Sequence, residues 1–196
     1  MKKAVKTLIS FLSVNREEEA LRTEKYLKTV EEKTPKAILL ACPQSARMLT
    51  VDREALYTVE SYGNTVYSNE ATLDHAVRRL QIPLLCIMGH AGCGALRAEL
   101  KLNDATDAEK ALHEAIAAEL KDAPARGEKR ALYAVDRQVA AALERYNDVV
   151  KSGKLAVAGL YCDEKGNVFL TNYNGLKGKE ALAYSLPEVD PAFFWA

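Results

Sequence analysis

Two short, wholly apolar runs with a helical pattern between them are the feature that most limits how this chain can fold. Ala37–Cys42 and Leu84–Gly89 have the length and composition of strands that are buried on both faces. Between them, Asn69–Gln81 places Ala71, Leu73, Ala76, Val77 and Leu80 at helical spacing and predicts a helix capped by Asn69. Strand, helix and strand in this order predict a parallel sheet with right-handed crossovers. We therefore expect an α/β fold.

The rest of the chain continues this alternation. Helical spacing and alanine-rich composition predict three further helices, at Arg16–Glu32, Asp107–Lys121 and Lys129–Val150. Further strands are expected at Leu56–Val59, Leu155–Cys162 and Val168–Thr171, the last two joined by a hairpin turn at Asp163–Asn167. No repeat or linker interrupts the 196 residues, so we expect one domain spanning residues 1–196.

The charge balance argues against some classes of partner without excluding a local charged patch, and the cysteine usage indicates a compartment. The 27 basic and 27 acidic side chains balance, so no net field attracts nucleic acid or an anionic membrane. The first 14 residues lack a signal cleavage site, and no apolar run approaches the roughly 20 residues that span a bilayer. Four cysteines in such a chain fit a reducing cytoplasm, where thiols are buried, metal-bound or catalytic. We expect a cytoplasmic protein.

Cys42, His90 and Cys93 form the main candidate site. Cys42 and His90 stand at the carboxyl ends of the two predicted parallel strands, where open α/β sheets gather their ligands. Two thiolates and one imidazole are donors that zinc prefers, and three protein ligands leave a fourth position for water. Gly94 would let the backbone turn beneath the metal into the next helix.

A second interpretation of the same residues needs no metal. Cys42 could be a small buried apolar residue and His90 a loop histidine with its hydrogen bonds satisfied, because a single H-x-x-C motif is weakly specific. Cys86 and Cys162 lie inside apolar strands, so we expect them to pack in the core. His75 and His113 lie in charged helical segments and are expected at the surface.

Four blocks of this sequence resemble successive blocks of the β-class carbonic anhydrases. They are the apolar run ending in Cys42 with its polar turn and arginine, SYGNTV at Ser61–Val66, TLDHAVRRLQIPLLCIMGHAGCGAL at Thr72–Leu96, and LAVAGLYCDEKGNVFLTNYNG from Leu155 onward. They occur in the family's order and span most of the chain.

The resemblance implies a fold, a metal and an activity. The fold is a mostly parallel β-sheet with an antiparallel edge strand, flanked by helices, and the assembly is a homodimer or higher oligomer. The resemblance also implies a zinc ion held by Cys42, His90 and Cys93, and a lyase that reversibly hydrates carbon dioxide to bicarbonate through zinc-bound hydroxide. Gly63 and Asn64 match a family block that shapes the pocket wall.

The chain departs from the family pattern directly after Cys42. The family has Cys-x-Asp-x-Arg, in which the aspartate orients the zinc-bound hydroxide and pairs with the arginine. Here Gln44 and Ala46 take these positions, and Arg47 follows one residue late. Gln44 can accept a hydrogen bond but cannot take a proton. With Gln44 and Arg47 as the nearest counterparts of the catalytic pair, we expect zinc binding with impaired carbon dioxide hydration, or a related reaction.

Three other functions remain open. One is a zinc hydrolase acting on carbonyl sulfide or carbon disulfide, and another is a zinc protein of this fold without catalysis. The third makes Cys42 a nucleophile with Arg47 five residues on, as in rhodanese-type loops, although CPQSAR lacks the glycine that bends such loops around an anion.

Overall fold

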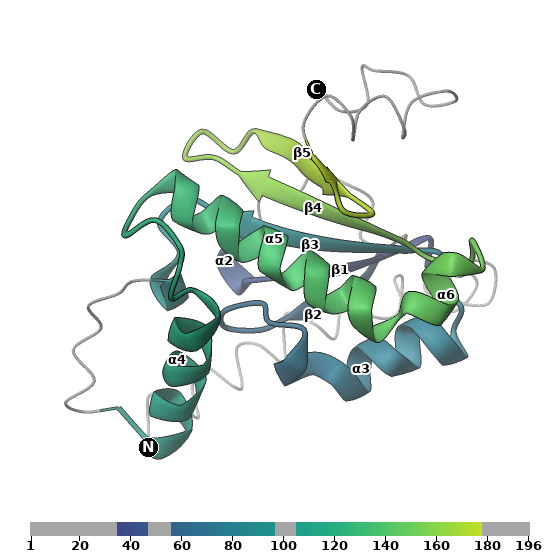
Figure 1. The fold of residues 1–196 in the computed structure, drawn as a ribbon, viewed down its shortest axis with the longest axis horizontal. Coiled ribbons are helices and arrows are strands. Elements are labelled where there is room, and N and C mark those ends of the chain that lie inside the picture. Colours follow the sequence, from purple (N-terminus) through teal and green to yellow (C-terminus); the bar gives the residue numbers. More distant parts are fainter. Residues whose placement is uncertain (1–34, 47–55, 97–104, 178–196) are drawn as a thin grey trace, which may run out of the picture. The chain divides into compact units, whose positions relative to one another are not determined.

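The computed structural model describes residues 35–46, 56–96 and 105–177, all within the compact unit Pro35–Ala196. The helix predicted at Arg16–Glu32 and the residue Arg47 lie outside these ranges. A six-stranded sheet forms the centre of the unit, with strand order β2-β1-β3-β4-β5-β6. Figure 1 shows the sheet behind helix α5.

The first four strands of this order are parallel. They are β2 (Leu56–Glu60), β1 (Ala37–Ala41), β3 (Leu84–His90) and β4 (Ala156–Cys162). The last two, β5 (Val168–Tyr173) and the short β6 (Leu176–Lys177), run antiparallel at one edge. The predicted fold class is therefore confirmed, and β6 is an addition to it.

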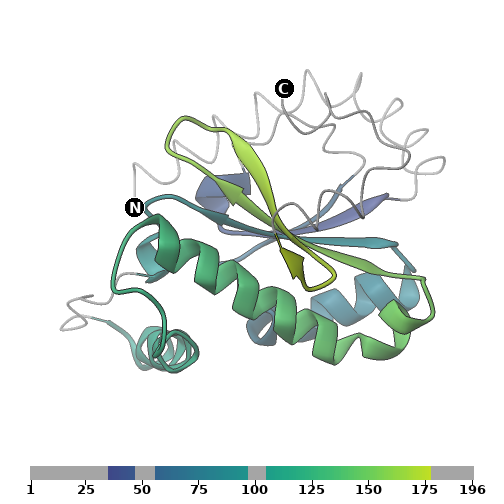
Figure 2. The same cartoon turned by 45° about the horizontal axis from the view of Figure 1, so that its top comes forward.

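Helices cover one face of this sheet. They are α3 (Glu70–Asp74) with the π-helical turn His75–Arg79, α5 (Glu128–Arg145) and α6 (Asn147–Lys151), which lie on the same side of the strands in Figures 1 and 2. The main apolar core lies between these helices and the sheet. Its fully buried members include Ile38, Leu40, Leu85, Ile87, Val139 and Val157.

Two further helices stand at the carboxyl ends of the parallel strands. Helix α2 (Pro43–Ala46) follows β1 directly. Helix α4 (Asp107–Glu119) lies near the 3-10 turn Gly94–Leu96 that follows β3. A capping box between Thr106 and Glu109 fixes the start of α4.

The helix predicted at Asn69–Gln81 differs from the expectation in three ways. The Asn69 side chain does not cap it, and instead donates hydrogen bonds to Ser61 and Thr65. Ala71 and Leu80 are exposed, whereas the other three predicted inward residues are buried. A π turn holds more residues per turn than an α-helix, so it rotates Leu80 away from the core.

The helix predicted at Lys129–Val150 is divided at Tyr146. Helix α5 ends before this residue and α6 begins after it. The Tyr146 side chain is fully buried, and its hydroxyl donates to Asp74 at 3.0 Å. This long-range contact is absent from the local pattern, so the pattern alone predicted one continuous helix.

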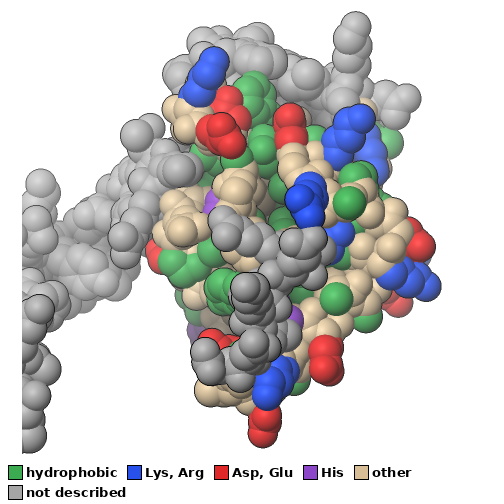
Figure 3. Space-filling model, turned by 90° about the vertical axis from the view of Figure 1, so that its left-hand side faces the viewer, with side chains coloured by type: hydrophobic (Ala, Val, Ile, Leu, Met, Phe, Trp, Pro, Cys, Tyr) green, Lys and Arg blue, Asp and Glu red, His purple; other side chains and the backbone are tan. Residues whose placement is uncertain are grey.

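The surface carries charges of both signs. Figure 3 shows the described basic and acidic side chains interspersed on the face in view, without a patch of one sign. None of the described helices combines the length and the apolar composition that a bilayer crossing requires.

Candidate metal centre

Cys42 lies at the tip of β1 because the chain turns there into a helix. The Cys42 carbonyl accepts hydrogen bonds from the backbone N–H of Ser45 at 2.9 Å and of Ala46 at 3.0 Å, and from the Ser45 hydroxyl at 3.0 Å. The turn that follows β1 is thus closed by three hydrogen bonds, and the thiol is held where the buried strand ends.

His90 and Cys93 are positioned by the end of β3. His90 is the last residue of β3 and pairs with Cys162 of β4, and the next N–H, of Ala91, donates to the Cys162 carbonyl at 2.9 Å. Gly92 then turns the chain with φ 66°. Gly94 begins the 3-10 turn Gly94–Leu96 directly after Cys93, without a positive φ.

The three predicted ligands converge. One ligand atom from each of Cys42, His90 and Cys93 lies within 4.8 Å of the other two. All three residues are buried, with exposed fractions of 5%, 3% and 7%. Donor atoms within 4.8 Å of one another are near enough to share one ion, to which a sulfur bonds at about 2.3 Å.

The tautomer of His90 also suits a metal. Its Nδ1 lies 2.8 Å from the Ala91 carbonyl oxygen, which can only accept a hydrogen bond, so Nδ1 carries the proton. Nε2 is buried and has no hydrogen-bond partner. A buried nitrogen without a partner is costly, and metal-bound histidines are held by this kind of carbonyl contact at the other ring nitrogen.

Proximity alters the acidity of all three groups. Interaction with the Cys93 thiol, helped by His90, lowers the pKa of Cys42 to about 4 despite its burial. The pKa of Cys93 is raised, first by the neighbouring Cys42 and then by burial. The Cys42 sulfur also raises the pKa of His90. Cys42 is thus a thiolate at neutral pH, the form that binds metal.

The other two cysteines stand apart from this cluster. Cys162 is fully buried, as expected, and packs near Leu39 and Met88. The residue Cys86 is half-buried, but its thiol is desolvated, and this raises the pKa of the thiol to about 12. His75 is exposed, whereas His113 is half-buried and meets the Tyr62 ring edge-on with centroids 5.5 Å apart.

The residues that replace the family's catalytic pair behave differently from one another. Gln44 is exposed on α2, whereas Ala46 is 4% exposed and packs with Leu39 and Met88. Arg47 lies outside the described residues. The arginine position of the family motif is therefore filled by a small buried side chain.

A pocket opens beside His90 and Cys93, walled by α4, α5 and the Gly63–Thr65 turn. Asn64 supports this wall by donating from Nδ2 to the Met88 carbonyl at 2.9 Å. Gly63 has φ 79°, and a Cβ there would lie 2.8 Å from the Ile116 side chain, so this turn requires glycine. Gly63 and Asn64 thus shape the pocket wall as the resemblance implied.

Three residues near the site escaped the sequence prediction. Glu119 and Gln138 line the pocket from α4 and α5, and Arg130 donates from Nε to the Leu96 carbonyl at 2.8 Å, which ties α5 to the segment after Cys93. Each lies in a helical pattern that indicates only that a helix forms. No local signal in the sequence distinguishes them.

Comparison with known families agrees with this geometry. The family model for carbonic anhydrase matches residues 37–168, which include all three candidate ligands. The chain therefore belongs to the carbonic anhydrase family, and its fold is that of the β-class. No curated protein matches the sequence at a significant level.

Solved structures of this class have the same fold at low sequence identity. The β-carbonic anhydrase CcaA has a TM-score of 0.68 at 18% identity, covering 87% of this chain and 88% of its own. A Coccomyxa β-carbonic anhydrase in complex with acetazolamide has 0.68 at 20%, covering 92% of both chains. A tetrameric β-carbonic anhydrase from Sordaria macrospora has 0.68 at 16%, covering 84% of this chain and 96% of its own.

Proposed function

We propose that this protein binds one zinc ion through Cys42, His90 and Cys93 and catalyses the reversible hydration of carbon dioxide to bicarbonate. The observation that carries this proposal is the convergence of three buried donor atoms within 4.8 Å. Membership of the carbonic anhydrase family supports the same reaction.

Zinc held in such a site would act as a Lewis acid and lower the pKa of a bound water to about 7. The protein's own part is to hold the donors in place. The Ala91 carbonyl fixes the His90 tautomer. Because the pKa of Cys42 is low, little free energy is needed to deprotonate its thiol for metal binding. Burial of the three donors keeps bulk water from competing with them for the metal.

We further propose that hydration is slow in this protein. Gln44 and Arg47 are the nearest counterparts of the family's aspartate and arginine, but Gln44 cannot hold a negative charge and Ala46 cannot pair with it. The altered pair also leaves open a second candidate function, hydrolysis of an analogue such as carbonyl sulfide or carbon disulfide. The third candidate function is that of a zinc protein of this fold without catalytic activity.

Metal content and stopped-flow hydration, measured on the same preparation, test these functions. We expect about one zinc per chain and a weak hydration rate that depends on the metal. The Cys93→Ala variant should lose zinc, whereas Cys86→Ala removes a thiol outside the cluster and should keep it. Zinc bound equally well by both variants would refute the site, and a hydration rate typical of efficient carbonic anhydrases would refute the impairment.

Sulfide release separates the candidate reactions. Production of sulfide from carbonyl sulfide or carbon disulfide, with little carbon dioxide hydration, would assign the second function. Absence of both activities in zinc-loaded protein would assign the third.

The oligomeric state is a separate proposal. A homodimer or higher oligomer is supported by the tetrameric state named for the Sordaria macrospora enzymes. Analytical ultracentrifugation of the full chain tests it, and a monomer at micromolar concentration would refute it. The single domain over residues 1–196 and the cytoplasmic location stay predictions.

A further inference from the structure

We propose that Glu119 excludes anions from the metal pocket and thereby selects an uncharged substrate. The inference rests on the proposed function, because it concerns the ligand that takes the open metal position. It assigns a role to a residue that no motif in the sequence singles out.

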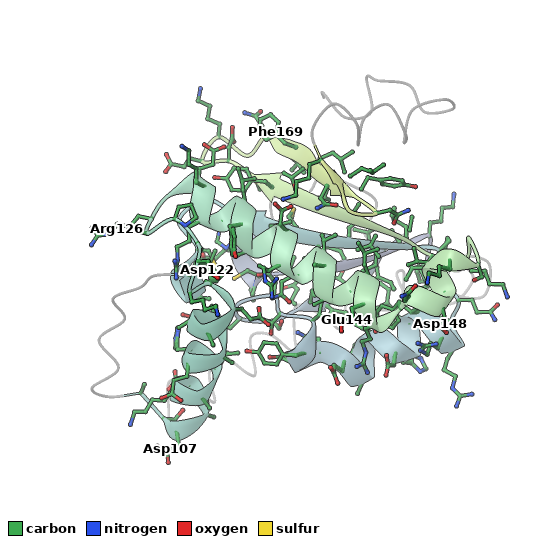
Figure 4. The ribbon with its side chains drawn as sticks, viewed as in Figure 1. Asp107, Asp122, Arg126, Glu144, Asp148 and Phe169 are labelled. Atoms are coloured by element: carbon green, nitrogen blue, oxygen red, sulfur yellow. The ribbon has the colours of Figure 1, made fainter. Side chains whose placement is uncertain are left out.

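Glu119 gives the pocket its negative charge. It lies in the last turn of α4, and its side chain lines the same pocket as His90 and Cys93. The other lining residues are uncharged apart from the titratable His90 and Cys93 themselves. Asp107, at the opposite end of α4, lies far from the sheet in Figure 4, so the acidic start of this helix does not contribute to the pocket.

A buried glutamine holds this carboxylate in place. Gln138 of α5 is 5% exposed, and its Oε1 accepts a hydrogen bond from the Val66 backbone N–H at 2.7 Å. This contact fixes the orientation of the amide, because the backbone N–H can only donate. The Nε2 end of Gln138 therefore faces Glu119 and donates to its Oε2.

The carboxylate lies outside the ligand group itself. Among the described residues, the candidate metal group contains Cys42, His90 and Cys93 and no carboxylate. Glu119 thus lines the pocket beside the candidate ligand group and is not one of the ligands. Its charge acts on whatever enters, across a pocket lined mostly by apolar and amide groups where charge interactions are stronger than in water.

This arrangement suits a reaction with a neutral reactant and an anionic product. A fixed negative charge leaves the entry of carbon dioxide, carbonyl sulfide or carbon disulfide unaffected, because these molecules carry no net charge. It repels bicarbonate, thiocyanate and similar anions. Glu119 would therefore lower anion affinity and help to release an anionic product.

Binding of thiocyanate to the cobalt-substituted protein tests this role, with the cobalt absorption spectrum as the readout. We expect Glu119→Gln to bind thiocyanate about tenfold more tightly than the wild type, the effect of one unit charge in a partly hydrated pocket. The carboxamide can still accept the hydrogen bond from Gln138, so the pocket keeps its shape. Glu114→Gln, at an exposed position of the same helix, should leave the affinity unchanged.

A neutral ligand distinguishes an effect of the charge of Glu119 on affinity from an effect of a changed pocket shape. Imidazole at alkaline pH should bind Glu119→Gln and wild type equally. An unchanged thiocyanate affinity, an equal gain for imidazole, or a loss of cobalt from Glu119→Gln would each overturn the inference. If Glu119→Gln does not fold, Glu119→Ala replaces it with the same expectation.

The wild-type protein distinguishes the two proposals. Failure to bind one cobalt ion would refute the proposed metal site and the inference with it. Cobalt bound by the wild type with no change in anion affinity in the variants would refute the inference alone.

Discussion

Arg145 of α5 forms a two-point ion pair with Asp74 of α3. Its Nε lies 3.0 Å from Oδ1 and its Nη2 lies 2.7 Å from Oδ2. The Tyr146 hydroxyl donates to the same Oδ1 at 3.0 Å, and Arg145 also pairs with Glu70. These contacts hold α3 against the junction of α5 and α6, where the chain turns toward β4.

Asp74→Asn should destabilise the protein in a pH-dependent way. Arg145 holds the pKa of Asp74 below its usual range. The ion pair therefore stabilises the fold above the pKa of the unfolded aspartate, about 3.9, and this contribution is lost as the pH falls through the lower folded pKa. Because 37% of the Asp74 side chain is exposed, we expect only about 1 kcal/mol at pH 7.

Thermal unfolding checks this prediction. Asp74→Asn should lower the Tm by about 2–4 °C at pH 7 and by less at acid pH, as the wild-type carboxyl takes up a proton. Glu144→Gln removes a charge from an exposed position on α5, labelled in Figure 4, and should change the Tm little at either pH. A Tm difference for Asp74→Asn that is the same at both pH values would contradict the ion-pair explanation.

Cys42 should be the thiol that reacts first in metal-free protein. With a pKa of about 4 it is a thiolate at pH 6, whereas the pKa values of Cys93 and Cys86 are raised. Iodoacetamide at pH 6, followed by peptide mass spectrometry, should label Cys42 before the others. Zinc should block the labelling and a chelator should restore it.

The same experiment tests why the pKa of Cys42 is low. Removing its strongest partner in Cys93→Ala should raise the pKa of Cys42 and slow its labelling at pH 6. Cys86→Ala should not. Labelling of Cys42 and Cys93 at equal rates in the wild type would show that the cluster does not lower this pKa.

Gly89→Ala should destabilise the fold through one specific contact. A Cβ at this position would lie 2.5 Å from Cγ2 of Val135, on the face of β3 that α5 covers. We expect a cost of about 1–3 kcal/mol from the overpacking, measured by urea unfolding. Because Gly89 precedes His90, zinc affinity should fall as well.

Val135→Ala should compensate for this change. Alone it removes a buried side chain that is 1% exposed, and it should cost about 2 kcal/mol. In the double variant the new methyl group enters the space that the valine leaves. The double variant should therefore lose less unfolding free energy than the sum of the losses in the two single variants. Strictly additive costs would exclude this contact as the reason for glycine at position 89.

Gln44→Asp alone should not restore efficient hydration. A carboxylate at the exposed position 44 would have no arginine partner at position 46, where Ala46 is buried against Met88. We expect stopped-flow rates within about tenfold of the wild type, and unchanged zinc content. A rate increase of several orders of magnitude would show that the missing charge was the sole defect.

The sequence by itself predicted every strand of the sheet except β6, and the three residues that converge at its edge. Apolar runs such as Ala37–Cys42 specify buried strands locally, and the end of a run fixes which residue stands at the strand tip. Cys42, His90 and Cys93 could be predicted as a group because parallel strands end at one edge of a sheet.

Only the tertiary structure decided which distant side chains complete the site and where the helices break. Glu119 and Gln138 meet beside the candidate metal group because α4 and α5 come together there, and the long helix breaks at Tyr146, whose hydroxyl reaches Asp74. A helical pattern reports which face is apolar but not which helix lies opposite. Contacts between residues far apart in the chain depend on packing, which local spacing does not encode.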